Sequence, residues 1–532
     1  MSKLKFSLLL PVLLVSGCDL PWSKTSKEIV PTPLYYTDYA DTNKISDTLE
    51  AGSNQAVSEF KQPTIVVSWQ GREELLARFQ TLLPQGALEQ LTATYEKAGS
   101  TAWGQVSSVP GTLYWFSPKE LPNTFSATTG TWVLQTKAPL TQADAAAFQQ
   151  KSTLLVSKRD QFTYIGAEVD YLESVASNQP KLEALNSRTN QSLSIDFYPS
   201  IELIESLSRN LPTSLSAPDT DPLVQVLLAC LRNTDRISAY LTVDSANQEL
   251  AFSLTTAAAQ DSLLRNLYSS VVGSPGPEGK WMSPKNAVEM QVGSFNHVAI
   301  EKFLTAQPES NKDLLRIFLA YLKIAKGNYA GAKYQDSKGQ VYSSWAIELN
   351  PNMQASLIRY VDQGTKYISA ILKNRSLLET EAVFQGPDAR GVYSYLPPKL
   401  VGNPNPDQLY FGFVSNYVTL TSNRAALDSL VQSISSKTEL SPNLLSSARL
   451  NPFTLNYALT YVPVPDLTGG APRNIPIRTS LEAGNGTAGI HLSLSKEWVS
   501  YFTSIATQLI EAQGTQNSAP LPVDAKKPTA KK

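Results

Sequence analysis

Residues 237–255 read ISAYLTVDSANQELAFSLT, and this stretch decides the fold that we expect. Apolar side chains alternate with polar ones at Ala239, Leu241 and Val243, which is the period of a strand that buries one face. Residues 244–247 then supply turn-forming side chains, and a second β-patterned run follows them. We therefore predict a β-hairpin here, followed by a helix.

Similar patterns recur along the chain, where short β-patterned runs alternate with amphipathic helical segments. We therefore predict an α+β fold in which antiparallel hairpins and sheets are covered by amphipathic helices. The expected hairpins span 152–165, 237–255, 381–395 and 409–421, and the expected helices include 72–83, 85–97, 223–231, 354–373 and 498–512.

A weak internal repeat is visible in these patterns. Residues 237–272 and 475–512 each read strand, turn, strand and helix, and residues 154–176 and 413–434 each read hairpin and helix. The second member of each pair lies roughly 240–260 positions after the first, which suggests a duplicated two-domain arrangement. The alternative is that an α+β protein repeats a hairpin and a helix without any duplication.

The composition limits the classes of protein to which this chain can belong. It has 532 residues, of which 17% are charged and 42% hydrophobic, with 45 Lys and Arg against 46 Asp and Glu. The length exceeds the ~250–300 residues at which single cores stop growing, so we expect more than one core. This balance excludes a disordered polyelectrolyte, a polytopic membrane protein and a charge-driven nucleic-acid binder. Two cysteines and two histidines exclude a disulfide scaffold and a His-rich metal site.

The first 18 residues carry the most specific signal in the sequence. Lys3 and Lys5 precede an apolar run over residues 6–15, which is shorter than the roughly 20 residues of a membrane-spanning helix. The run ends in Val-Ser-Gly-Cys at residues 15–18. This motif resembles the lipobox of bacterial lipoprotein precursors, in which an aliphatic and two small residues precede an obligatory cysteine.

The resemblance implies that the signal is cleaved between Gly17 and Cys18, and that Cys18 carries the lipid that attaches the chain to a membrane. Asp19 at the next position favours retention in the inner membrane, as in lipoproteins of enteric bacteria. The signal peptide would cover residues 1–17 and the lipidated tether 18–62. We expect the remaining parts to be a first α+β domain over 63–276, a second over 277–512 and a disordered basic tail over 513–532.

No complete catalytic or metal-binding motif is recognisable in the sequence. Ser493 and Lys496 match a serine–lysine spacing, but they lie in a strand pattern and no Lys-Thr-Gly follows. Asp219 and Asp221 provide too few oxygens for Ca²⁺, and Asp221 is better explained as a helix cap. Cys230 lies among apolar residues and is expected to be a buried thiol. We therefore predict no catalytic residue, no cofactor and no metal.

Three functions remain open. We expect a lipid-anchored, periplasm-facing protein with a non-catalytic binding or scaffolding role, whose partner is an envelope protein or polymer and not a nucleic acid. The first alternative is an envelope hydrolase, which buried acids in a deep cleft, or His297 or His491 beside a serine or an acid, would favour. A shallow apolar or aromatic surface would favour binding. The second alternative is a structural lipoprotein joined to the cell wall, suggested by the lysine-ended tail.

Overall fold

The computed structural model describes residues 60–83, 108–117, 130–138, 154–185, 191–200, 230–306, 320–439, 452–465 and 470–505, apart from single positions within these ranges, and a few isolated residues between them. The predicted cleavage and lipid sites at Gly17 and Cys18, the sorting residue Asp19, the predicted tether up to residue 59 and the predicted C-terminal tail lie outside the described residues.

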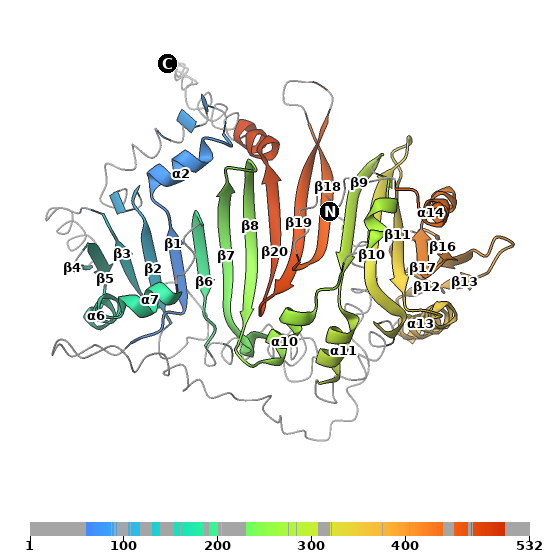
Figure 1. The fold of residues 1–532 in the computed structure, drawn as a ribbon, viewed down its shortest axis with the longest axis horizontal. Helices are drawn as coiled ribbons and strands as arrows, with labels where there is room; N and C mark the ends of the chain where they lie inside the picture. The colour runs from blue at the N-terminus through green and yellow to red at the C-terminus, as the bar shows by residue number, and fades with distance from the viewer. Residues whose placement is uncertain are drawn as a thin grey trace, which may run out of the picture.

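One antiparallel sheet of 18 strands organises the described residues (Figure 1). From one edge, the first eight strands in spatial order are β4 (Leu155–Arg159), β5 (Phe162–Gly166), β3 (Thr131–Thr136), β2 (Gly111–Phe116), β1 (Ile65–Trp69), β6 (Leu193–Phe197), β7 (Thr234–Asp244) and β8 (Glu249–Ala258). The next ten are β20 (Thr487–Ser495), β19 (Arg473–Gly484), β18 (Thr454–Val464), β9 (Ala287–Ser294), β10 (Ala325–Gln335), β11 (Val341–Leu349), β17 (Tyr417–Thr421), β16 (Leu409–Val414), β14 (Tyr393–Leu396) and β13 (Val383–Gln385). A separate pair is formed by β12 (Leu378–Thr380) and β15 (Lys399–Leu400).

The predicted α+β arrangement of helix-covered hairpins and sheets is wrong. Hairpins do form over 237–255 and 409–421, as β7–β8 and β16–β17. However, β8 pairs with β20 and β9 pairs with both β10 and β18, so the hairpins join into a single, mostly β structure. These pairings connect strands that are far apart in the sequence, and no local hydrophobic period encodes them.

The strand order repeats in the two halves of the sheet. The first half runs β4-β5-β3-β2-β1-β6-β7-β8, and the second runs β16-β17-β11-β10-β9-β18-β19-β20 toward the same centre. β8 begins at Glu249 and β20 begins at Thr487, 238 positions later. Because the two strands are antiparallel neighbours, this arrangement places a local twofold axis between them, normal to the sheet. The repeated strand order does not test the domain limits expected from the sequence, 63–276 and 277–512, which remain a prediction.

The pairing register defines the two faces of the sheet, because residues opposite each other in antiparallel strands share a face. One row joins Ser194, Tyr240, Ser253, His491 and Ser480, and continues in both directions to Tyr164 and Val292. We call this side the Ser253 face. The next residue along β8 points to the opposite side, which we call the Leu254 face.

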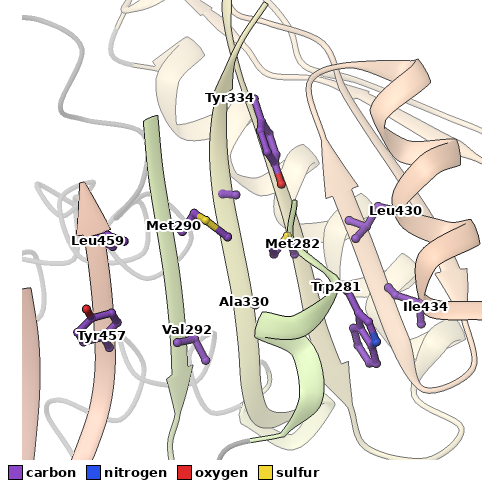
Figure 2. Close-up of a cluster of buried hydrophobic side chains, with 12 residues drawn as sticks. Trp281, Met282, Met290, Val292, Ala330, Tyr334, Leu430, Ile434, Tyr457 and Leu459 are labelled. Carbon is purple, nitrogen blue, oxygen red and sulfur yellow. The ribbon is translucent and has the colours of Figure 1, made fainter. Parts of the chain in front are cut away.

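Helices cover the outer parts of the Ser253 face in both halves. In the first half, α6 (Val169–Ser177) and α7 (Gln179–Leu185) pack Leu172, Val175 and Leu182 against Tyr164 and its neighbours. In the second half, the covering elements are α14 (Arg424–Ser436) and the short 3-10 helix η2 (Pro277–Trp281). Figure 2 shows this cluster, in which residues of β9, β10 and β18 share a core with Leu430 and Ile434 of α14.

Helices also border the Leu254 face. The long helix α13 (Gln354–Asn374) packs Leu357 against the outer strands β16 and β17. At one end of the central strands lie α2 (Arg72–Phe79) and the helical residues 496–505, and at the other end lie α10 (Leu263–Ser270) and α11 (His297–Thr305), as Figure 1 shows. Among the described helices, these are the ones that border the central strands, and they lie at the ends of those strands.

Local sequence explains where several of these elements begin and turn. Ser262, Asn296 and Asn423 cap α10, α11 and α14, because each side chain accepts a hydrogen bond from a backbone N–H of the first turn. The β19–β20 hairpin turns at Asn485 and Gly486, both with positive φ, as the tight turn of a twisted hairpin requires.

Candidate functional site

An apolar surface lies at the centre of the Leu254 face, where the two halves of the sheet meet. Two neighbouring rows of side chains cross the strands here. The first row contains Ile195, Ala239, Leu254, Ile490 and Leu481, on β6, β7, β8, β20 and β19. The second row contains Leu193, Leu241, Phe252, Leu492 and Thr479 on the same five strands.

The members of these rows on β6, β7, β8 and β20 form the floor of a shallow groove of about 350 Å³, which we call the central groove, and Leu481 and Thr479 of β19 continue the rows beyond it. Its side chains are exposed although they are hydrophobic: Ile490 is 55% exposed and Leu254 is 51% exposed. The residues whose side chains line it are Leu193, Ile195, Ala239, Leu241, Phe252, Leu254, Ile490 and Leu492, and none of them carries a charge. Tyr240 and Ser253 also border the groove, although the register places their side chains on the Ser253 face. Exposed apolar surface of this kind is unusual in a folded protein and typically marks an interaction site.

Packed clusters limit the central groove on three sides. At one end of the strands, Val243 and Leu250 join Leu82 and Val499 in a buried cluster. At the other end, Tyr268 of α10 contacts the Thr256 hydroxyl on β8 at 3.1 Å between their oxygens. Beyond β6, the face continues through β1 and β2 into the cluster around Leu134 and Ile165. The floor of the groove is therefore held in place by packed residues around it.

A polar cluster lies behind the same strands, on the Ser253 face. His491 Nδ1 is 2.7 Å from Ser253 Oγ, and His491 Nε2 is 3.8 Å from Glu482 Oε2. Tyr240 meets the imidazole edge-on, and Ser480 donates a hydrogen bond to Glu482. A histidine beside a serine and an acid is one of the arrangements that we expected to favour a hydrolase.

The geometry of this cluster differs from that of an activated serine. Ser253 lies in the middle of β8 and is paired with Tyr240 on one side and His491 on the other. Its backbone N–H is therefore committed to the sheet, as are those of its strand neighbours, and is not available as an oxyanion donor. The 3.8 Å separation from Glu482 also exceeds hydrogen-bonding distance, so the acid does not orient the imidazole.

A second group of polar side chains is buried under η2. Glu278 is fully buried; its Oε1 accepts a hydrogen bond from the Tyr417 hydroxyl, and its Oε2 has no hydrogen-bond partner among the described residues. Burial raises the pKa of Glu278 and that of Tyr417. Glu348 lies nearby and accepts hydrogen bonds from Lys326 and Asn328. These residues belong to a packed core under the covering elements, and within the described ranges no three His, Cys, Asp or Glu residues could hold a metal ion.

The remaining sequence candidates are dispersed. His297 begins α11, and its Nδ1 lies 3.1 Å from the Lys326 carbonyl, with no serine or acid recorded beside it in the described structure. Cys230 is half-buried, where a fully buried thiol was expected, and its partial burial raises the pKa of the thiol. Asp219 and Asp221 lie outside the described residues. Sequence reasoning missed the central groove, although the apolar alternation in β7, β8 and β20 was visible, because it assigned that face to a helix-covered core.

Comparison with known proteins adds no assignment to this geometry. No family model, curated protein or solved structure matches the chain. Among the helices of the described part, none is both long and apolar enough to cross a membrane.

Proposed function

We propose that this chain is a lipid-anchored protein of the bacterial cell envelope, held at a membrane through Cys18, and that it acts by binding an apolar partner in the central groove. The observation that carries the proposal is the groove itself: a floor without charge at the junction of the two halves, exposed at Leu254 and Ile490. Concave, mostly apolar surfaces are the usual form of binding sites.

The anchor is supported by the Val-Ser-Gly-Cys motif at residues 15–18 and by the short apolar run before it. Each buried methylene of an attached acyl chain contributes about 0.8 kcal/mol to membrane affinity, so two or three chains hold a protein firmly. A membrane-attached body would meet apolar molecules at high local concentration, which fits a binding role for the groove.

Photo-crosslinking in intact cells tests the binding role. A photoreactive amino acid at position 490 replaces an exposed groove residue, and the same amino acid at position 401 replaces Val401, which is 60% exposed and belongs to none of the residues that line the groove. We expect position 490 to capture a specific species, identified by mass, that position 401 does not capture. Equal capture at both positions, or capture at neither, would contradict the proposal.

The anchor is tested by substituting each of the two cysteines in turn. Cys18→Ala is expected to abolish incorporation of labelled palmitate and to release a folded protein from membranes. Cys230→Ala is the matched control, since it removes the only other thiol and is expected to leave both properties unchanged. A Cys18→Ala product that still carries palmitate would exclude this residue as the lipid site.

An envelope hydrolase is the second candidate, favoured by the contact between Ser253 and His491. A fluorophosphonate probe reacts with activated serines and distinguishes the two functions. Labelling of Ser253 that is lost in His491→Ala would favour the hydrolase. The binding proposal predicts no labelling of Ser253, since the site lacks an oxyanion donor.

A further inference from the structure

We infer that the central groove holds the acyl chain of a single-chain amphiphile with an uncharged, hydroxyl-bearing head, such as a monoacylglycerol. This inference rests on the proposed binding function and names the class of ligand for the same surface. The chain would cross the strands from β6 to β19, and the head would lie over β18 and β10.

The dimensions of the groove fit one acyl chain. The residues that line it come from four neighbouring strands, β6, β7, β8 and β20, which corresponds to about 14 Å at the usual strand spacing. The exposed Leu481 of β19 continues the apolar row by one more strand, to about 19 Å. An acyl chain in a bilayer spans one leaflet, which is half of the hydrocarbon core of about 30 Å, or about 15 Å. The groove is therefore about as long as one acyl chain. The volume of about 350 Å³ is near the lower end of the range for small-molecule sites, roughly 300–1,000 Å³.

The two ends of the groove differ in polarity. Toward β6 the floor ends on Leu193 and Ile195 and then passes into a buried apolar cluster. Toward the other end, Leu481 is followed in its row by Asn456 on β18 and then by Gly293 on β9 and Tyr329 on β10. An apolar end and a polar end on one continuous row are the pattern that an amphiphile matches.

The polar end carries uncharged hydrogen-bonding groups. The Tyr329 hydroxyl donates to Asn456 Oδ1 at 3.1 Å, and Gln291 lies on the same face of β9. All three side chains are half-buried. The nearest charges on this face of β9 and β10, Glu289 and Lys333, form an ion pair with each other. Such groups suit hydroxyl and ester oxygens better than a phosphate, which would require an uncompensated cation.

The central strands explain why the groove is apolar in the middle and polar only at one end. The offset of 238 positions between β8 and β20 makes Phe252 equivalent to Ile490 and Leu254 equivalent to Leu492. The twofold axis therefore repeats the apolar floor about its centre. β6 and β18 occupy equivalent places in the two halves, but β6 presents Leu193 and Ile195 whereas β18 presents Asn456 and Ala458.

The area argues against a second copy of the chain as the occupant. Two rows across five strands give an apolar surface on the order of 300 Å², counting about 19 Å by about 14 Å. A stable protein interface typically buries about 800 Å² on each partner. The floor has the size of a ligand site, and the cluster around Leu82 at one side and α10 with Tyr268 at the other limit the approach of another sheet.

The test uses the full chain in the membranes of cells that express it, and a monoacylglycerol probe with a diazirine in its acyl chain. A probe with the diazirine at the end of the chain is expected to label peptides that contain β6 or β7. A probe with the diazirine next to the ester is expected to label peptides that contain β18 or β19. Identical labelling by the two probes, or labelling outside the groove strands, would overturn the inference.

Competition by unlabelled monoacylglycerols measures the fit of the chain. Since each buried methylene raises affinity about fourfold, competition is expected to strengthen from decanoyl toward palmitoyl chains and to stop improving once the groove is filled. Leu254→Ser with Ile490→Ser is expected to reduce labelling at least tenfold, and the matched variant Val401→Ser is expected to leave it unchanged. Leu254, Ile490 and Val401 are all exposed, so we expect these substitutions to leave the fold intact. An unchanged thermal unfolding temperature checks this.

The outcomes separate this inference from the proposed function. Crosslinking from position 490 that adds the mass of a lipid supports both. Crosslinking from position 490 to a protein, with no lipid adduct and no labelling by either diazirine probe, overturns the acyl-chain ligand and leaves the binding function. Labelling by a diazirine phosphatidic acid equal to that by the monoacylglycerol would overturn the uncharged head.

Discussion

His491 on β20 faces Ser253 on β8 across the centre of the sheet, with 2.7 Å between His491 Nδ1 and Ser253 Oγ. The two residues are 238 positions apart, the same offset that separates the starts of β8 and β20. Each therefore occupies the place of the other about the local twofold axis, and their hydrogen bond joins the two halves on the Ser253 face. Directly behind them, Leu254 and Ile490 join the halves through the floor of the central groove.

Ser253→Ala tests the value of this hydrogen bond. The substitution leaves a part-buried imidazole nitrogen without its partner, so we expect the free energy of unfolding to fall by about 1 kcal/mol. Urea unfolding measures the change. Ser429→Ala is the control, since the Ser429 hydroxyl donates only to a carbonyl of its own exposed helix turn and its loss is expected to have little effect. Equal effects of the two substitutions would assign no stabilising role to the contact at the axis.

The ion pair between Arg478 and Glu249 also crosses the junction, because β20 lies between β19 and β8. Glu249 is buried, so removal of its charge leaves Arg478 less well compensated. We expect Glu249→Gln to lower the free energy of unfolding by about 1–2 kcal/mol. The loss stays moderate because Arg478 is half-exposed and water can still solvate its charge. The i,i+4 pair of Lys366 and Asp362 is the control, for which Asp362→Asn is expected to cost about 0.5 kcal/mol or less. A double-mutant cycle for Glu249 and Arg478 gives the coupling directly, and zero coupling would refute this assignment.

The local elements were predictable to a large extent, whereas their assembly was not. The hairpin over 237–255 follows from its alternation and its Asp244 turn, and the Asn485-Gly486 turn has the residues that its positive φ values require. β10 does not stand out in the sequence, because Ala325–Gln335 is rich in Gly and Ala and has only a weak strand pattern. Its small residues are explained only by the neighbouring strands, since the ring of Trp345 lies over Gly331.

The candidate site was not predictable for a related reason. Alternation in β7 and β8 identifies one apolar face, but it does not indicate whether a helix covers that face or solvent meets it. The pairing of Leu254 with Ile490 depends on two segments far apart in the chain, and the same holds for Ser253 and His491. Sequence reasoning therefore found the apolar residues and assigned them to a core, although half of the Leu254 side chain is exposed.

Gly327→Ala tests the close approach between β10 and the segment that follows β9. Gly327 has φ +118°, and a Cβ there would lie 2.0 Å from the Phe295 carbonyl oxygen, which is backbone and cannot rotate away. We expect a loss of at least about 1–3 kcal/mol in the free energy of unfolding from the backbone strain alone. Gly364→Ala in α13 is the opposite control, because no atom lies near its added Cβ and helix propensity predicts a gain of about 0.5–1 kcal/mol. A tolerated Gly327→Ala would mean that this approach is looser than described.

Glu278→Gln tests the buried carboxyl of η2. Burial raises the pKa of Glu278 in the folded protein, so the folded state holds this proton more tightly than the unfolded state does. Stability is therefore expected to fall as the pH rises from the unfolded pKa of about 4.3 through the raised folded pKa. The neutral Gln keeps an oxygen for the Tyr417 hydroxyl and is expected to remove this pH dependence, with equal or higher stability at pH 7. Urea unfolding from acidic to neutral pH measures the difference, and parallel profiles for the two proteins would contradict the assignment.

The two cysteines give a test that links the folded body to the lipid anchor. Cys230 is the only cysteine in the described body, and burial raises the pKa of its thiol, so we expect alkylation of the native protein to be slow at neutral pH and to accelerate only on unfolding. If Cys18 carries a thioether-linked lipid, the unfolded protein has one reactive thiol, and if it does not, the unfolded protein has two. Counting alkylated thiols by intact mass in denaturant distinguishes these cases. The variant Cys230→Ala sharpens the result, because it is expected to have no reactive thiol even when unfolded, and any alkylation of it would place a free sulfur at residue 18.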